Sequence, residues 1–130
     1  MLSNIEIINR LDKIAEEDKR YRKEAYLFVL VALEHTVSKL PVRRHLSGQD
    51  LSKGIANFAR QQYGYMAKTV LDRWGVRSTM DYGEIVYLMI EHGLLSKSGQ
   101  DSKKDFAHVY NFDKEFSWNN VKPSKFPERF

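Results

Sequence analysis

The chain has 130 residues, of which 42% are hydrophobic and 12% aromatic, and it carries a formal net charge of +4 at pH 7. A chain of this length buries about two-thirds of its unfolded surface, so the composition predicts one folded domain over residues 1–130 rather than a disordered chain. The sequence contains no cysteine, which excludes disulfides, thiolate zinc sites, iron–sulfur clusters and cysteine nucleophiles.

Neither a signal peptide nor a membrane span is expected. Glu6 and Asp12 interrupt the apolar residues near the N-terminus, so no uncharged apolar region forms there. The longest uninterrupted apolar run, Ala25–Leu33, has nine residues, whereas a helix that crosses a bilayer needs about 20. Together with the lack of cysteine, this predicts a cytoplasmic protein without a membrane partner.

The N-terminal part, residues 1–40, predicts two helices. Ser3 and Glu6 have the spacing of a capping box. Ile5, Ile8 and Leu11 then recur at helical spacing, which predicts a first helix of about four turns.

A second helix is expected from residue 18 or 19 to about residue 39. Its centre, 25–33, is apolar on every side, which predicts a helix that is buried on all sides at the centre of the core. A buried strand is the alternative for so short an apolar run, but the charged residues around the run favour the helix. Pro41 ends the helix, because the residue before a proline avoids helical backbone.

The next part of the chain, 47–93, predicts a unit of three helices that each end in a glycine. They run from Ser47 to Gly64, from about residue 65 to residue 73 with Gly75 as the cap, and from Ser78 or Thr79 to Gly93. Gly54 lies inside the first of these helices, where glycine costs about 1 kcal/mol relative to alanine. We therefore expect Gly54 to permit the close approach of a neighbouring helix.

After Gly93 the periodicity changes, and the sequence predicts a β-hairpin within 94–112. Leu94–Lys97 is short and extended, residues 98–102 are rich in turn formers, and apolar residues alternate from Phe106 to Phe112. The predicted fold class is therefore mainly α, with about five helices and a C-terminal β-hairpin, in an order like that of a winged helix-turn-helix. Residues 117–130 are expected to form an irregular tail that its aromatic rings anchor to the body.

No pattern in the sequence indicates catalysis, a cofactor or a metal ion. There is no nucleophile-elbow sequence, no Walker loop and no Gly-x-Gly-x-x-Gly loop. The four histidines are far apart and form no zinc-binding array: His35, His45, His92 and His108. We predict no catalytic, cofactor-binding or metal-binding residue, and hence a protein that is not an enzyme.

Basic residues are concentrated in the middle of the chain, where 41–79 holds seven basic and two acidic residues, a net charge of +5. Such a bias can attract phosphates, although a solvated helical face is the more common explanation. The candidate nucleic-acid-binding residues are Arg43, Arg44, Arg60, Lys68, Arg73 and Arg77. The helix in the DNA-reading position, Asp81–His92, argues against binding through that helix, because it has three carboxylates and no lysine or arginine.

Several segments resemble a family of small bacterial proteins of unknown function. They are 24–33, 45–51, 70–76, 81–97 and 101–113. The resemblance covers about 20–116 and implies a standalone bacterial domain, without an activity, a cofactor or a catalytic residue to carry over.

These observations predict a small non-enzymatic module that binds another protein. The expected contact surfaces are the hairpin, the aromatic tail or the basic middle of the chain. The alternative is a winged-helix-like protein that binds nucleic acid through 43–77.

Overall fold

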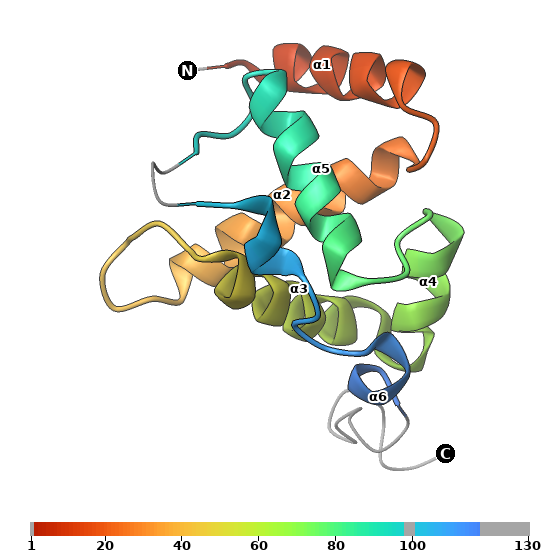
Figure 1. The fold of residues 1–130 in the computed structure, drawn as a ribbon. Coiled ribbons are helices and arrows are strands. Elements are labelled where there is room, and N and C mark those ends of the chain that lie inside the picture. The colour runs from red at the N-terminus through yellow and green to blue at the C-terminus, as the bar shows by residue number, and fades with distance from the viewer. Residues whose placement is uncertain (1, 98–100, 118–130) are drawn as a thin grey trace, which may run out of the picture.

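The structure is a computed structural model that describes residues 2–97 and 101–117, and this part of the chain is mainly helical (Figure 1). The elements are α1 (Asn4–Glu17), α2 (Lys23–Ser38), α3 (Gly48–Tyr63), the 3-10 helix η1 (Gly64–Met66), α4 (Ala67–Arg73), α5 (Thr79–Glu91), the 3-10 helix η2 (Lys103–Phe106) and α6 (Phe112–Glu115). None of the helices in the described ranges is long and apolar enough to cross a membrane. The expected tail lies outside these ranges, apart from Ser117.

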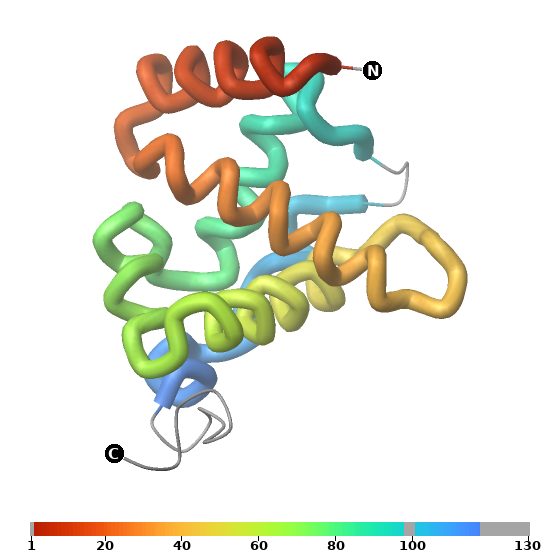
Figure 2. The backbone as a smooth tube through the Cα atoms, turned by 180° about the vertical axis from the view of Figure 1, so that it is seen from behind, coloured from red at the N-terminus to blue at the C-terminus, as the bar shows by residue number. Residues whose placement is uncertain are grey.

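The central helix is α2, which packs against α3, α5 and α1. α2 and α3 lie side by side and run in opposite directions (Figure 1 and Figure 2). α1 lies at the C-terminal end of α5, where the Arg10 guanidinium donates a hydrogen bond to the His92 carbonyl at 2.9 Å. The prediction of a helix rather than a buried strand over 25–33 is confirmed.

Helix starts predicted from capping residues are confirmed at α1 and α3. Ser3 Oγ accepts a hydrogen bond from the Glu6 N–H at 3.1 Å, and Ser47 Oγ accepts one from the Asp50 N–H at 3.0 Å. These acceptors satisfy N–H groups that the first turn of a helix leaves without a backbone partner. α2 begins at Lys23, later than expected, because the Arg20 N–H donates to the Asp18 carboxylate and forms a separate turn.

The three glycines predicted to end helices have a positive φ, which confirms their role. The values are +53° at Gly64, +93° at Gly75 and +76° at Gly93. Glycine adopts this conformation readily because it has no Cβ atom to clash with the backbone.

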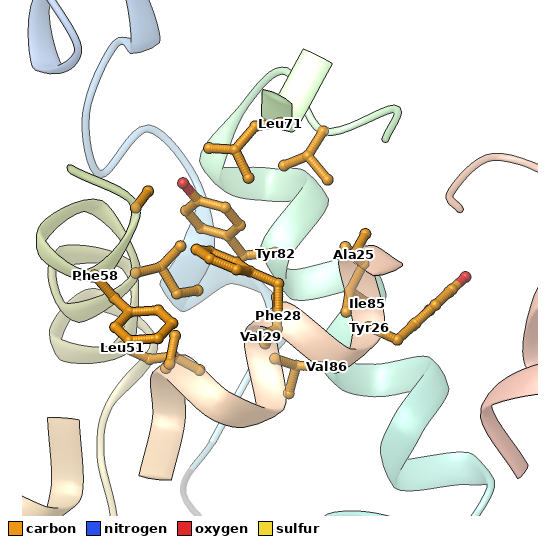
Figure 3. Close-up of a cluster of buried hydrophobic side chains, with 14 of the residues drawn as sticks. Ala25, Tyr26, Phe28, Val29, Leu51, Phe58, Leu71, Tyr82, Ile85 and Val86 are labelled. Carbon is orange, nitrogen blue, oxygen red and sulfur yellow. The ribbon is translucent and has the colours of Figure 1, made fainter. Parts of the chain in front are cut away.

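The core lies where α2, α3 and α5 meet (Figure 3). Phe28 and Val29 of α2 point toward Phe58 of α3 and toward Tyr82 and Ile85 of α5, and the side chains fill the space between the helices. Tyr82 and Ile85 are fully buried. The core is therefore built from helix-to-helix contacts between segments that are distant in sequence.

The predicted β-hairpin is wrong, and so is the winged-helix order that depends on it. The parts of 94–112 that the structure describes contain no strand. Ser102 and Asp105 form a capping box that begins η2, and Asn111 Oδ1 accepts from the Lys114 N–H at 3.2 Å to begin α6. These local hydrogen bonds bend the chain into helical turns, so the alternation from Phe106 to Phe112 does not correspond to a strand.

Side-chain hydrogen bonds hold this segment against α3 and α5 in place of a sheet ladder. Thr79 Oγ1 donates to the Phe106 carbonyl at 2.6 Å. The Tyr110 hydroxyl donates to the Ser52 carbonyl at 2.9 Å and lies 2.6 Å from the Tyr82 hydroxyl. Phe106 and Phe112 are buried as expected of core residues, but they reach the core from η2 and α6.

The prediction that α2 is buried on all sides is also wrong. Leu27 is 49% exposed and Val31 is 45% exposed. The two residues are four apart, so they occupy one face of the helix. α2 thus has the composition of a fully buried helix and one uncovered apolar side.

Gly54 allows α2 and α3 to approach each other closely, as the sequence predicts. A Cβ atom at this position would lie 2.2 Å from Thr36 Oγ1 and 3.0 Å from Thr36 Cβ. Thr36 cannot easily move away, because its hydroxyl donates to the Ala32 carbonyl at 2.7 Å.

We expect Gly54→Ala to lower the free energy of unfolding by up to about 2 kcal/mol. Overpacking costs about 1–3 kcal/mol, and the better helix propensity of alanine offsets about 1 kcal/mol of that cost. Urea denaturation followed by circular dichroism measures the change. In a double-mutant cycle, Thr36→Ala should reduce the cost of Gly54→Ala, whereas strictly additive losses would show that this contact is not responsible.

Candidate functional site

The six basic residues predicted to bind nucleic acid do not form one patch. They lie on separate elements: Arg43 and Arg44 in the loop before α3, Arg60 in the last turn of α3, Lys68 and Arg73 on α4, and Arg77 before α5. The loop and the last turn are at opposite ends of a 16-residue helix, which is roughly 24 Å long. Of the six, the structure brings Arg73 and Arg77 into one hollow and Lys68 and Arg77 into another.

Carboxylates compensate the charge of most of these residues. The ion pairs are Arg43 with Glu34 at 2.9 Å, Arg44 with Asp50 at 3.5 Å, Arg60 with Glu115 at 2.9 Å, Lys68 with Asp113 at 3.1 Å and Arg77 with Asp72 at 2.7 Å. Arg73 has no such partner within the described ranges. Because affinity for nucleic acid depends on cations that neutralise phosphates, this pairing lowers the charge that 43–77 can offer.

The uncovered side of α2 lines a cavity of about 280 Å³ between α2, α3 and the end of α4, which we call the aromatic groove. Figure 2, in which α2 passes in front of α5, shows α2 and α3 side by side, with α4 near the N-terminal end of α2. The lining residues are Glu24, Leu27, Phe28, Val31, Phe58, Gln62, Tyr63 and Trp74. The lining is thus mostly apolar and includes a single charged side chain, Glu24.

Phe28 organises the rings of the aromatic groove. Its ring centroid lies 5.2 Å from that of Phe58, 5.8 Å from that of Tyr63 and 5.4 Å from that of Trp74. Tyr63 and Trp74 also contact each other edge to face at 6.0 Å. Pairs at these distances attract one another, so the groove has a rigid aromatic wall beside the exposed Leu27 and Val31.

A second cavity of about 500 Å³ lies between the turn that joins α1 to α2 and the turn that joins α4 to α5, and we call it the basic hollow. Six cationic side chains line it: Lys19, Arg20, Arg22, Lys23, Arg73 and Arg77. Arg20, Lys23 and Arg77 form ion pairs with Asp18, Asp12 and Asp72 respectively. No carboxylate within the described ranges pairs with Lys19, Arg22 or Arg73, so these three carry uncompensated charge.

The N-terminus of α2 adds to the positive potential of the basic hollow. Its N-cap residue, Arg22, makes no side-chain capping hydrogen bond. Arg22 is instead held by its backbone, whose N–H donates to the Trp74 carbonyl at 3.1 Å. The N-terminal end of a helix carries a partial positive charge, which has the same sign as the surrounding side chains.

Ion pairing shifts the pKa values of Asp18 and Arg20, and burial shifts the pKa of Tyr21. The side-chain hydrogen bond from Arg20 lowers the pKa of Asp18 and raises the pKa of Arg20 itself. Burial, and then the hydrogen bond to Asp81, raises the pKa of the Tyr21 phenol well above its usual range. Tyr21 therefore stays protonated near neutral pH and donates to Asp81.

The aromatic groove and the basic hollow form one continuous surface. Glu24 and Trp74 line both of them. A nucleophile with a base beside it is not part of either lining, and the surface presents apolar area at one end and cations at the other. Its chemistry is that of a binding surface for an apolar ligand that carries negative charge at one end.

The histidines stay apart in the structure. His45 pairs with Asp101, and His92 lies 3.5 Å from Glu17. The described residues contain no group of three histidine, aspartate or glutamate side chains that could hold a metal ion.

Sequence reasoning missed most of the residues of this surface. The cations of the basic hollow that precede α2 belong to 1–40, where seven basic and seven acidic residues sum to zero. The available signal was local: Lys19, Arg20, Arg22 and Lys23 lie within five consecutive residues.

Comparisons of the chain with protein-family models, curated proteins and solved structures give no match in any of the three. The resemblance to a family of small bacterial proteins therefore stays a prediction. The function has to be argued from the geometry of the surface.

We expect the contact between Tyr21 and Asp81 to stabilise the wall of the basic hollow. Asp81 accepts from the Tyr21 hydroxyl at 2.6 Å and from the backbone N–H groups of Arg77 and Ser78 at 2.8 and 3.1 Å. Asp81→Ala should lower the free energy of unfolding by about 2–4 kcal/mol, because it removes a helix cap and a charged hydrogen-bond acceptor. Tyr21→Phe should cost about 1.5–2 kcal/mol.

Urea denaturation of the two single variants and the double variant tests this coupling. The double variant should lose clearly less stability than the sum of the single losses, since Asp81→Ala leaves the buried Tyr21 hydroxyl without its partner. Glu91→Ala, an exposed change at the other end of α5, is the control and should be nearly neutral. Additive losses would contradict a direct contact between Tyr21 and Asp81.

Proposed function

We propose that the chain is a non-enzymatic interaction module that binds a helical segment of another protein in the aromatic groove. One observation carries the proposal: α2 has the composition of a helix buried on all sides, yet Leu27 and Val31 are about half exposed. Single exposed apolar residues are common on protein surfaces. Two of them on one helix face, beside a groove with an aromatic wall, are typical of a binding site.

Covering this face supplies a useful part of a binding free energy. Complete burial of a leucine or valine side chain is worth about 1.5–3 kcal/mol. Since Leu27 and Val31 are already about half buried, covering both contributes about 1.5–3 kcal/mol in total. Trp74 and Tyr63 add aromatic surface of the kind that dominates interface energies.

The shape of the groove favours a helix as its occupant. It runs along α2 and is bounded on the other side by α3, so the ridges of a third helix can pack between those of the first two. A peptide that binds by adding a strand would need an unpaired strand to join, and the described ranges contain none. In helix-in-groove binding, the groove contacts apolar residues at positions i, i+4 and i+7 of the partner helix.

The nucleic-acid alternative for 43–77 has weaker support. Five of its six candidate residues pair with a carboxylate, and Arg73 is the exception within the described ranges: the paired residues are Arg43, Arg44, Arg60, Lys68 and Arg77. The aromatic groove also offers apolar surface that a phosphate backbone cannot use.

A display library of helix-constrained peptides, selected against the full chain, tests the proposal. The chain has two tryptophans, Trp74 and Trp118. In a Trp118→Phe background, Trp74 is the single indole and reports directly on occupancy of the groove through its fluorescence. We expect selected peptides to shift Trp74 emission, and Leu27→Glu with Val31→Glu to weaken their binding at least tenfold.

The control is Val42→Glu, which places one carboxylate on a residue that is 76% exposed outside the groove, and it is compared with Leu27→Glu and Val31→Glu taken singly. It should change affinity less than twofold, and urea denaturation should show that all variants remain folded. Binders that ignore the Leu27 and Val31 changes would overturn the proposal. So would a concentration-dependent dimer that the same changes dissociate, since the face would then be covered by a second copy of the chain.

A further inference from the structure

We propose that the partner helix is acidic at its C-terminal end and lies antiparallel to α2, with that end over the basic hollow. This inference rests on the proposed function and adds the charge and the direction of the partner. Its basis is the position of uncompensated positive charge at one end of the aromatic groove.

The basic hollow adjoins the groove at the N-terminal end of α2. Trp74 and Glu24 line both cavities, and the groove extends from Glu24 along α2 to Val31. An occupant that covers Leu27 and Val31 and continues past Trp74 therefore reaches the cations.

Three cations are available to such an occupant. Lys19, Arg22 and Arg73 are exposed and have no ion-pair partner within the described ranges. The other positive side chains of the hollow are Arg20, Lys23 and Arg77, which are paired, and its one acidic lining residue is Glu24. The hollow thus keeps a net positive charge after its internal pairs are counted.

The opposite end of the groove lacks this charge. The next turn of α2 beyond Val31 presents Glu34, whose carboxylate binds the Arg43 guanidinium through two hydrogen bonds at 3.1 and 2.9 Å. Positive potential is therefore concentrated at one end of the groove, and charge complementarity gives the partner a direction.

Helix dipoles fix that direction in the same sense. The N-terminus of α2, at the basic hollow, has no side-chain cap and is the positive end of its dipole. The C-terminus of a helix is the negative end, with carbonyl groups that lack backbone donors. An antiparallel partner brings its carbonyls and any acidic residues of its last turn to Lys19, Arg22 and Arg73.

Two other occupants fit less well. Duplex nucleic acid has the required charge, but its base faces are stacked inside the helix and leave no apolar face for Leu27 and Val31. A second copy of the chain packed antiparallel on α2 would bring Glu34 toward the basic hollow, and Glu34 is already held by Arg43.

The experiment uses helix-constrained peptides of about 15 residues, roughly 22 Å long, with apolar residues randomised at positions i, i+4 and i+7. Three versions have glutamates in the last turn, the same glutamates in the first turn, or glutamines in both. Binding to the full Trp118→Phe chain is followed by Trp74 fluorescence. We expect the version with C-terminal glutamates to bind about tenfold more tightly than the other two, and the advantage to shrink at high salt.

Variants that remove charge from the basic hollow test whether its cations cause the tighter binding of the peptide with C-terminal glutamates. Lys19→Gln, Arg22→Gln and Arg73→Gln together should abolish the advantage of C-terminal glutamates and leave the glutamine version unchanged. Arg43→Gln, which lies outside both cavities, is the control and should preserve it.

The outcomes separate this inference from the proposed function. If all three versions bind equally and still require Leu27 and Val31, the proposed function stands and the inference is wrong. A preference for first-turn glutamates would overturn the antiparallel direction. If no version binds, the proposed function fails as well, and a single-stranded oligonucleotide that binds and shifts Trp74 emission would replace both.

Discussion

The close contact between the turn before α2 and the turn after α4 is the constraint on which the aromatic groove and the basic hollow both depend. Gly75 lies so near the first of these turns that a Cβ atom would be 2.2 Å from the Arg20 carbonyl oxygen, and its φ of +93° also favours glycine. The Arg22 N–H donates to the Trp74 carbonyl, and the Tyr21 hydroxyl donates to Asp81. One junction therefore sets both the position of Trp74 in the groove and the positions of the cations in the hollow.

α2 is the central helix and is still incompletely covered, because the element that the junction places beside its exposed face is short. α3, α5 and α1 each pack against it, and Phe28, Val29 and Ala32 are buried by them. Trp74 reaches α2 from the end of α4 and contacts Phe28, but α4 has seven residues, a length of roughly 10 Å. A helix this short cannot also cover Leu27 and Val31.

Local signals in the sequence predicted most of the helical fold. Ser3 and Ser47 begin helices, and Gly64, Gly75 and Gly93 end them. Each of these features depends on a few neighbouring residues, so a single sequence is enough to identify it. Gly54 was also interpreted correctly, because an unfavourable residue inside a helix needs a reason in packing.

The predicted hairpin and the predicted full burial of α2 were wrong because a pattern over many residues was given more weight than local signals or packing. The alternation from Phe106 to Phe112 suggested a strand, although Ser102 and Asp105 have a capping-box spacing like that used correctly at Ser3. The burial of α2 was overestimated because an apolar sequence shows that burial is favourable but does not show which element covers each face of the helix. The basic hollow was missed because charge was summed over long segments, whereas folding brings Arg22 and Arg73, which are distant in sequence, to one hollow.

The two halves of the surface would contribute to binding in different ways. Long-range attraction between Lys19, Arg22, Arg73 and an acidic segment accelerates encounter and weakens with salt. The apolar contacts of Leu27, Val31 and Trp74 act at short range and mainly slow dissociation. Exposed cations contribute little affinity by themselves, so in the proposed complex the apolar part would hold the partner and the charged part would orient it. An apolar groove with a basic hollow at one end would select the direction of a helix, which neither part could do alone.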